Sequence, residues 1–346
     1  MKKIIMFAAF VAAVTAIESC KKNFVDAPVT CANTRISVKL AGTVGTRAEE
    51  EGITAENTIN SVDLLVFFNG GEFDGRLDAF AHLTGAPYTV DATSGNRKVY
   101  AVVNSPVDLS YVENESQLLA SDVLLSSQKT GSGNLSNFTM IGSKTQTLAS
   151  GNNPVTVSVG RIASRVRIRK ITRDFGSAAL AAQSFSVDAL YLSNIVTRSP
   201  YSLDLTPVAA DFANKLGVCD NAFDTWAKRS VSTSLSDESS VSLDDASNYM
   251  YCFPNSISAD SEEDVFEVQN TKVVVECTLE GKKLYYVIPL GALEPNHSYD
   301  VSELVLTRPG SDDPNHKTEI SSCNFTINVL PWTLVPVETE PGKYVI

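Results

Sequence analysis

The chain has 346 residues, of which 28 are Lys or Arg, 40 are Asp or Glu, and 43% are hydrophobic. This length and apolar content suffice for two ordinary domains, each with its own core. Residues 1–47 hold seven basic and two acidic residues, which leaves 21 basic and 38 acidic residues in 48–346, a net charge of −17. Because phosphate backbones are bound by clustered positive charge, this acidic body argues against a nucleic-acid partner.

The first twenty residues have the pattern of a secretory leader. Lys2 and Lys3 precede an apolar run over residues 4–17, which is too short to span a bilayer as a mature helix. Cys20 follows an aliphatic residue at minus three and a small residue at minus one, as in a bacterial lipobox, although Glu18 departs from that pattern. We expect a signal peptide over 1–19 and acyl chains on Cys20 that hold the precursor on a membrane. An ordinary signal peptide with an unmodified cysteine is the alternative.

An alternating segment follows at 34–40, in which Ile36, Val38 and Leu40 share one face. Such a strand can pair with a sheet edge, where each apolar side chain contributes roughly 1.5–3 kcal/mol when fully buried. Arg47 stands in a small, polar stretch that fits a protease as an extended chain, so we expect a cut before Ala48. The sequence therefore predicts a pro-segment over 20–47 with a removable strand. The alternative is that 34–40 is a permanent first strand.

Alternation also dominates the remaining chain, and helical periodicity is scarce. Strands rich in β-branched and aromatic residues are predicted at 60–68, 97–104, 154–170, 185–192, 271–279, 283–290, 299–307 and 321–329. Short helices are predicted at 116–124 and 212–228. Strands spaced evenly through both halves predict an all-β protein with two β-sandwiches, 48–153 and 154–346. The boundary is expected in the Gly/Ser/Asn-rich stretch 150–153.

Arginines alternate with aliphatic residues in the predicted strand at 154–170. Arg165, Arg167 and Arg169 have a period of two, which puts them opposite Val166 and Ile168. We expect these arginines on a solvated sheet face, and a ligand-binding patch is the alternative.

Catalytic and metal-binding motifs are absent from the sequence. His82, His297 and His316 are far apart, and no nucleophile elbow, zinc-protease helix or phosphate-binding loop occurs. We therefore predict no enzyme activity, no cofactor and no metal site. Trp332, at the end of the last predicted strand, is expected to close the core rather than to anchor a partner.

Four cysteines lie in the body of the chain, at positions 219, 252, 277 and 323, without a CxxC pair. Their spacing argues against zinc. An exported chain can form disulfides, but we expect Cys219, Cys252, Cys277 and Cys323 to be small buried hydrophobic residues instead.

Taken in order, these segments resemble the fimbrillins, the pilus subunits of Bacteroidales bacteria. The resemblance depends on the cysteine leader, the pro-segment that ends in arginine, the segments 59–67, 98–104 and 161–166, and the closing Val-Leu-Pro-Trp of 329–332. It covers nearly the whole chain as a pattern of degenerate motifs in a fixed order.

The resemblance implies two transthyretin-like β-sandwich domains and a lipoprotein precursor anchored in the outer membrane through Cys20. It also implies cleavage of the Arg47–Ala48 bond by an arginine-specific protease and removal of the strand with Ile36, Val38 and Leu40. Another fimbrial subunit would then insert a donor strand into the vacated groove. In this chain the C-terminal donor candidates are Leu334, Val335, Val337, Tyr344, Val345 and Ile346, interrupted by Pro336 and Pro341.

The leading hypothesis is therefore a structural subunit of a cell-surface fimbria that supports adhesion. The alternative is a tip or accessory fimbrillin, or a surface lipoprotein that binds host protein or glycan without polymerising.

Overall fold

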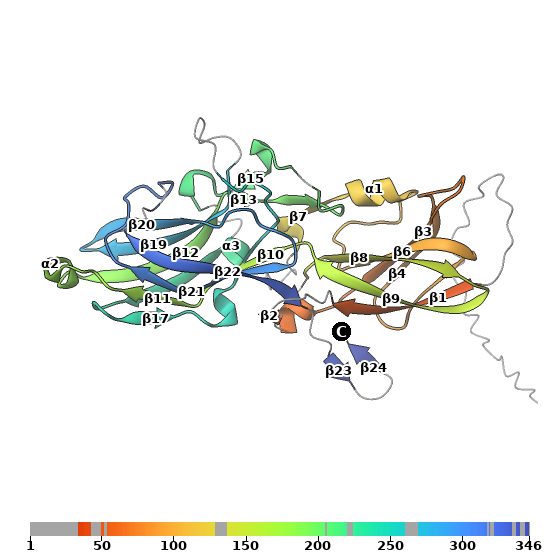
Figure 1. Ribbon diagram of the computed structural model, residues 1–346, viewed down its shortest axis with the longest axis horizontal. Helices are drawn as coiled ribbons and strands as arrows, with labels where there is room; N and C mark the ends of the chain where they lie inside the picture. Colours follow the sequence, from red (N-terminus) through yellow and green to blue (C-terminus); the bar gives the residue numbers. More distant parts are fainter. Residues whose placement is uncertain are drawn as a thin grey trace, which may run out of the picture. The chain divides into compact units, whose positions relative to one another are not determined.

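The computed structural model describes residues 34–42, 50–51, 54–128, 137–204, 206–219, 224–259, 269–316, 318, 322–333, 337–339 and 343–345. Most elements in these ranges are strands, and every helix is short (Figure 1). No helix within them is both long and apolar enough to cross a membrane. The predicted sites that lie outside the described residues are Cys20, Arg47, Ala48, Leu334, Val335 and Ile346.

The first group of strands forms one sheet that folds over on itself. Its order is β4 (Leu77–Leu83), β3 (Val62–Phe68), β6 (Gly95–Val103), β8 (Met140–Leu148), β9 (Gly151–Arg161), β1 (Thr34–Gly42) and β5 (Tyr88–Ala92). β8 pairs with β6 along its whole length, but it pairs with β9 only at Met140 and Ile141. The sheet therefore divides into two layers, β4-β3-β6-β8 and β9-β1-β5, which form the first β-sandwich.

Apolar side chains from both layers fill this sandwich. The members are Ile36, Val38, Leu40, Val90, Val155, Val157 and Val159 from one layer, and Val62, Leu64, Val66, Val99, Ala101, Val103, Met140 and Leu148 from the other. The opposite face of β3 and β6 is covered too, because Leu65 and Tyr100 join the larger core of the chain. Burial on both faces explains why the predicted strand at 60–68 is apolar almost throughout.

Gly142 lies in β8 beside the place where β8 and β9 separate. A Cβ atom built on Gly142 would lie 1.9 Å from the carbonyl oxygen of Ser158 in β9. The two backbones can approach this closely because glycine has no side chain.

The second β-sandwich packs one branched sheet against a simple one. In the branched sheet β21 (His297–Leu306) pairs with β22 (Cys323–Thr333), β10 (Ser164–Ile168) and β11 (Lys170–Arg173), and these last two pair with β18 (Met250–Cys252) and β17 (Ser240–Ser242). The simple sheet has the order β16 (Lys228–Ser234), β12 (Phe185–Ser193), β19 (Lys272–Leu279) and β20 (Lys282–Pro289). The prediction of an all-β chain with two sandwiches in tandem is confirmed (Figure 1).

Shorter elements connect these sheets. They are β2 (Glu50–Glu51), η1 (Thr54–Asn57), α1 (Glu115–Ala120), β7 (Asp122–Leu124), η2 (Leu125–Gln128), α2 (Ala178–Ala181), β13 (Ile195–Val196), β14 (Arg198–Pro200), η3 (Ala209–Asp211), β15 (Phe212–Ala213), η4 (Lys215–Gly217), α3 (Asp224–Ala227), η6 (Ala246–Asn248), β23 (Val337–Thr339) and β24 (Lys343–Val345).

The structure corrects two of the sequence-based boundaries. The expected domain boundary at 153 falls inside β9, whose first residues pair with β1 from Thr34 onward. Its polar composition suggested a linker, but these residues alternate between the core and solvent as the start of a long strand. The predicted helix at 212–228 is also wrong, because its described residues include β15, η4 and only one turn of helix in α3.

Candidate functional site: the β1 groove and the end of β22

β1 is the middle strand of its layer, between β5 and β9. The side chains of Ile36 and Leu40 are 0% and 1% exposed, and Val38 between them is 8% exposed. Arg35 and Lys39 alternate with them on the solvent side, where Arg35 donates to Asp91 at 2.9 Å. The predicted apolar face of this strand is thus buried, although β1 lies between two strands rather than beside a single edge.

The pairing of β1 differs on its two sides. It runs parallel to β9 over nine residue pairs, from Thr34 opposite Gly151 to Gly42 opposite Val159. It runs antiparallel to β5 over only five pairs, which end at Val38. A chain without β1 would therefore expose two strand edges and an apolar strip of core between them.

The two sides of the expected cut are held by different sheets. β1 ends at Gly42 in the first sandwich, whereas β2 pairs in parallel with the end of β22, Glu50 opposite Trp332 and Glu51 opposite Thr333. Arg47 and Ala48 lie between these two anchored strands. Loss of β1 would therefore leave the pairing of β2 with the second sandwich intact.

The η1 turn follows β2 in the chain, and it places a buried carboxylate in the second sandwich. Glu56 is 1% exposed and accepts hydrogen bonds from Arg165 Nη1 at 3.0 Å, Tyr251 Oη at 2.7 Å and Trp332 Nε1 at 3.1 Å. Arg161, at the end of β9, donates to the backbone carbonyls of Glu56 at 3.2 Å and Trp332 at 3.1 Å. We call Glu56, Arg161, Arg165, Tyr251 and Trp332 the Glu56 cluster.

Aromatic rings enclose the Glu56 cluster. The Trp332 ring stacks on Tyr251 with centroids 5.8 Å apart, and the guanidinium of Arg161 lies 4.3 Å above the Trp332 ring. Phe138, which precedes β8, packs edge-on against Trp332 at 5.5 Å. The prediction that Trp332 closes the core is confirmed, since its side chain is 0% exposed.

Burial perturbs the titration of the cluster. Desolvation lowers the pKa of Arg161 to about 10, against the opposing effect of the Glu56 charge. Desolvation also raises the pKa of Tyr251 well above its ordinary value, and the Glu56 charge adds to this shift. At neutral pH the cluster thus combines cationic Arg161 with a neutral Tyr251 phenol that donates a hydrogen bond to Glu56.

The alternating arginines of β10 are not on a solvated face, which corrects the expectation from sequence. Arg165 is 0% and Arg167 2% exposed. Arg167 lies 3.1 Å from Asp300 in β21, and the half-buried Arg169 lies 2.8 Å from the same carboxylate. Desolvation raises the pKa of Asp300, but the hydrogen bonds and charges of Arg169 and Arg167 outweigh it, so its pKa is lower than the ordinary 3.8.

The outermost strand β22 presents part of its apolar row to solvent. Cys323 is 2% exposed, but Phe325 is 37% and Val329 45% exposed. Ile327 of the same row is half-buried, so the apolar side of β22 is only partly covered. Further along, the backbones of β23 and β24 pair with each other, Val337 opposite Val345.

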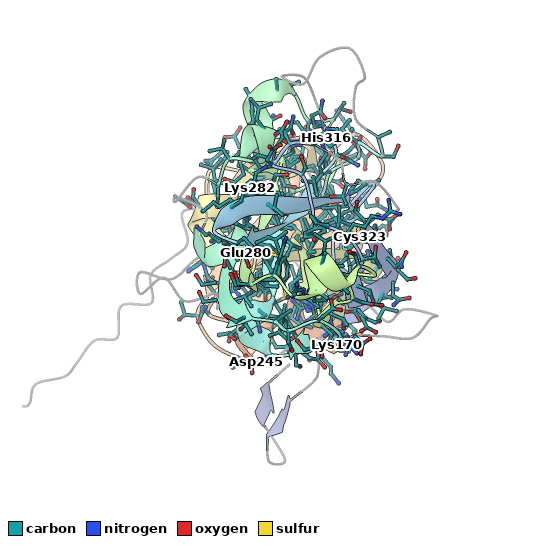
Figure 2. The ribbon with its side chains drawn as sticks, turned by 90° about the vertical axis from the view of Figure 1, so that its left-hand side faces the viewer. Lys170, Asp245, Glu280, Lys282, His316 and Cys323 are labelled. Carbon is teal, nitrogen blue, oxygen red and sulfur yellow. The ribbon has the colours of Figure 1, made fainter. Side chains whose placement is uncertain are left out.

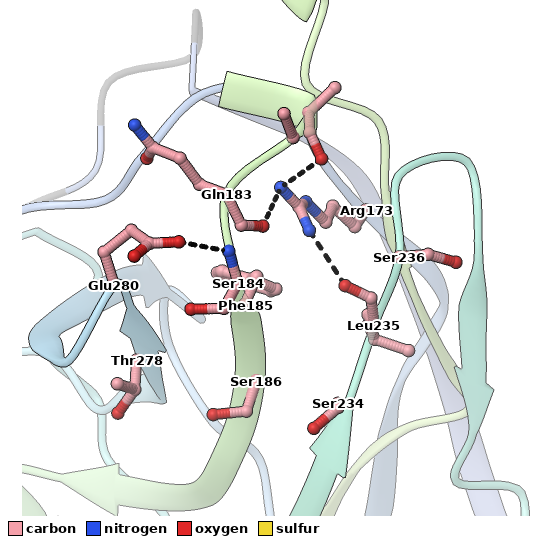
Figure 3. Close-up of a pocket in the computed structure, with 12 residues that line it drawn as sticks. Arg173, Gln183, Ser184, Phe185, Ser186, Ser234, Leu235, Ser236, Thr278 and Glu280 are labelled. Atoms are coloured by element: carbon pink, nitrogen blue, oxygen red, sulfur yellow. Dashed lines mark hydrogen bonds between the residues drawn. The ribbon is translucent and has the colours of Figure 1, made fainter. Parts of the chain in front are cut away.

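An open depression of about 550 Å³ lies in the second sandwich, beside α2 and the adjoining ends of β12 and β16 (Figure 3). Its only lining cation, Arg173, donates to the backbone carbonyls of Leu235 at 2.9 Å and of Leu180 at 2.7 Å. Glu280 accepts from the backbone of Ser184. The charged groups of this depression therefore hold loops together, and they are not arranged around a shared reactive point.

The three histidines remain apart. His82 pairs with Asp63 at 2.7 Å, His297 lies 3.7 Å from Glu294, and His316 is exposed at the end of the second sandwich (Figure 2). Within the described ranges, no group of three or more His, Cys, Asp or Glu side chains is arranged to hold a metal ion.

None of the four body cysteines forms a disulfide bond in the part of the chain that the structure describes. Cys252, Cys277 and Cys323 are buried, as predicted, and Cys219 is half-buried. Burial raises the pKa of Cys252 to about 12 and that of Cys323 to about 11, which keeps both thiols protonated and inert.

Sequence reasoning identified the β1 face and Trp332 but missed the Glu56 cluster. Glu56 stands in a short polar segment and pairs with Arg165, 109 residues away. The available signal was the row of arginines in an otherwise aliphatic strand, which needs buried partners when both faces of the sheet are covered.

Comparison with known proteins confirms the fimbrillin resemblance. Residues 34–166 match the sequence model of the major fimbrial subunit protein (FimA) family. This range contains β1, the whole first sandwich and the start of β10. No curated protein sequence matches the chain.

Solved structures share the fold over most of the chain. A candidate cell adhesion protein from Bacteroides eggerthii aligns with a TM-score of 0.64 at 20% identity, covering 88% of this chain and 98% of that one. The fimbrilin of Porphyromonas gingivalis aligns with a TM-score of 0.59 at 14% identity, covering 88% and 99%. The tip fimbrial protein of the same species aligns with a TM-score of 0.50 at 13% identity, covering 87% and 100%. At these identities the alignments establish the fold.

Proposed function

We propose, with the match to the major fimbrial subunit family as the premise, that this chain is a structural subunit of a cell-surface fimbria. The observation that carries the proposal is the place of β1. It is the middle strand of its layer, its apolar face is buried, and the chain that follows it contains the expected cut between Arg47 and Ala48. Cleavage there by an arginine-specific protease would free β1 and open a groove between β5 and β9.

The proposed assembly step is the insertion of a strand from a neighbouring subunit into that groove. An incoming strand can restore the backbone hydrogen bonds of both edges and bury alternate apolar side chains, as in other strand-addition complexes. The donor candidates lie after Trp332, at Leu334, Val335, Val337, Tyr344, Val345 and Ile346. Lipid on Cys20 would hold the precursor in the outer membrane until the cut releases it.

The runner-up is a tip or accessory subunit, or an anchored lipoprotein that binds a host protein or glycan. One observation favours it. The strands β23 and β24 pair with each other, and Pro336 and Pro341 remove two backbone donors from a prospective donor strand.

The test compares a chain that begins at Ala48 with a precursor that carries Arg47→Ala. The stalk proposal expects the first to form ladders that resist dissociation in detergent and the second to stay monomeric in the presence of the protease. Two monomeric proteins, even after mixing with a peptide of residues 334–346, would contradict it and favour the accessory role. Amino-terminal sequencing of protein recovered from the cell surface adds an independent check, because Ala48 is the expected first residue.

A further inference from the structure

Trp332 is the last residue in the chain whose side chain the structure describes, and it directly precedes the C-terminal tail. Each of its polar groups takes part in a hydrogen bond. Its backbone N–H donates to Asn296 at 2.8 Å, its carbonyl accepts from Arg161 at 3.1 Å, and its indole N–H donates to Glu56 at 3.1 Å. The ring is held between Tyr251 and Arg161. The chain therefore leaves the second sandwich from a fixed point.

The side chains that hold Trp332 come from three distant parts of the chain, and Asn296 adds a backbone carbonyl from a fourth. Glu56 follows β2, which itself pairs with Trp332 and Thr333. Arg161 ends β9, the strand that flanks the β1 groove, and Tyr251 lies in β18. The Glu56 cluster thus joins the beginning of the processed chain, the end of the groove strand and the start of the tail.

A buried charged cluster is a costly way to stabilise a core, because ions lose their hydration there. It is better suited to fixing geometry, since each donor reaches the carboxylate from one direction. A donor strand that starts from a fixed point loses less conformational freedom when it enters a groove than one that starts from a mobile end.

We propose that Glu56 is a positioning residue for assembly, which fixes Trp332 and thereby the direction in which the C-terminal tail leaves its own subunit to reach the next one. This inference rests on the proposed strand exchange. It assigns Glu56 to the donor side of the reaction, although Glu56 is close in sequence to the strand that is removed from the acceptor side.

The experiment tests the same substitution in two proteins, one that can only donate its tail and one that can only accept a tail. A precursor with Arg47→Ala keeps β1 in its groove, so it can donate its tail but cannot accept one. A processed chain from Ala48 that carries Val335→Asp, Val337→Asp and Val345→Asp can accept but cannot donate. Formation of the detergent-resistant heterodimer from these two proteins is followed over time.

Glu56→Gln in the donor is expected to slow heterodimer formation about tenfold. The same substitution in the acceptor is expected to leave the rate within about twofold, because Arg161 at the end of β9 binds the backbone carbonyl of Glu56, which the substitution keeps. A general loss of stability would affect both placements, so equal slowing overturns the inference, as does no slowing in the donor.

Trp332→Phe supplies the second variant, since it keeps an aromatic ring but removes the indole N–H. It is expected to reproduce the donor defect and to be silent in the acceptor, and it carries the test if Glu56→Gln fails to fold. If the donor and acceptor with unsubstituted Glu56 and Trp332 form no heterodimer, strand exchange itself is contradicted. That result differs from one in which the heterodimer forms at the same rate with and without Glu56→Gln.

Discussion

Removal of β1 is expected to destabilise the first sandwich and to leave the second sandwich folded. The perturbation is the shortening of a chain that begins at Ala32 to one that begins at Ala48. Ile36, Val38 and Leu40 are between 0% and 8% exposed. At roughly 1.5–3 kcal/mol each, their burial contributes about 5–9 kcal/mol, an upper estimate because unfolded chains are partly compact.

This loss is comparable with the whole stability of an ordinary domain, which is about 5–15 kcal/mol. The nine residue pairs with β9 and the five with β5 are lost in addition. The first sandwich of the processed chain should therefore open locally or unfold, whereas the second supplies most of the larger core and keeps its pairing with β2.

Hydrogen exchange measured by mass spectrometry separates these two responses. Peptides from β5 and β9 are expected to lose protection in the shortened chain, while peptides from β19 and β20 keep it. Unchanged protection of β9 after removal of β1 would refute the reasoning.

Addition of a synthetic peptide with the sequence of residues 34–42 should restore protection in β5 and β9. A peptide with Leu40→Ser is expected to fail, because Leu40 is buried at 1% exposure. The matched control is a peptide with Lys39→Ser, whose side chain is exposed. Equal rescue by both variants would mean that the groove does not recognise the apolar face of β1.

Three further predictions concern the body of the chain. Gly142→Ala should lower the free energy of unfolding in urea by about 1–3 kcal/mol or more, since the new Cβ meets the backbone of β9. The control Gly176→Ala should lower it less, because a Cβ there has no non-neighbouring atom within 4 Å. Equal losses would contradict the close approach of the two backbones. Asp300→Asn should cost about 3–5 kcal/mol at neutral pH. Because the native pKa of Asp300 is below the unfolded 3.8, its contribution is present above pH 3.8 and lost as the pH falls through the native pKa, so the unfolding free energies of the two proteins should converge in acid. In a chain that begins at Ala32, a water-soluble thiol reagent should modify Cys219 first and the other three thiols only on unfolding; two fast thiols in the native protein would contradict this.

The local sequence pattern was sufficient to predict many of the strands, because runs of β-branched and aromatic residues mostly form buried strands. The strands at 60–68, 185–192 and 283–290 correspond to β3, β12 and β20 within a few residues. β8 was missed, since its middle residues from Lys144 to Thr147 are polar and face solvent on an outer strand. No apolar period exists there for a sequence argument to detect.

The Glu56 cluster could not be predicted for a different reason. Whether an arginine in a strand is solvated or buried depends on what covers its face, and for Arg165 that cover is supplied by Glu56 and Trp332, which lie on opposite sides of it in the sequence. Contacts between residues so far apart in the sequence depend on the topology of the fold, and they produce no periodic pattern in the local sequence. The expectation of a solvated face followed correctly from the pattern and was wrong because both faces are covered.

The arrangement would also allow one chain to open at its groove and remain stable elsewhere. β1 belongs to the first sandwich, and the residues directly after the expected cut belong to the second, through the pairs Glu50–Trp332 and Glu51–Thr333. A protease that acts between them would cut the segment 43–49, which links β1 of the first sandwich to β2, the strand that pairs with the second sandwich. Cleavage would then destabilise the groove that must open. Trp332, from which the tail departs, would remain fixed by its hydrogen bond to Glu56.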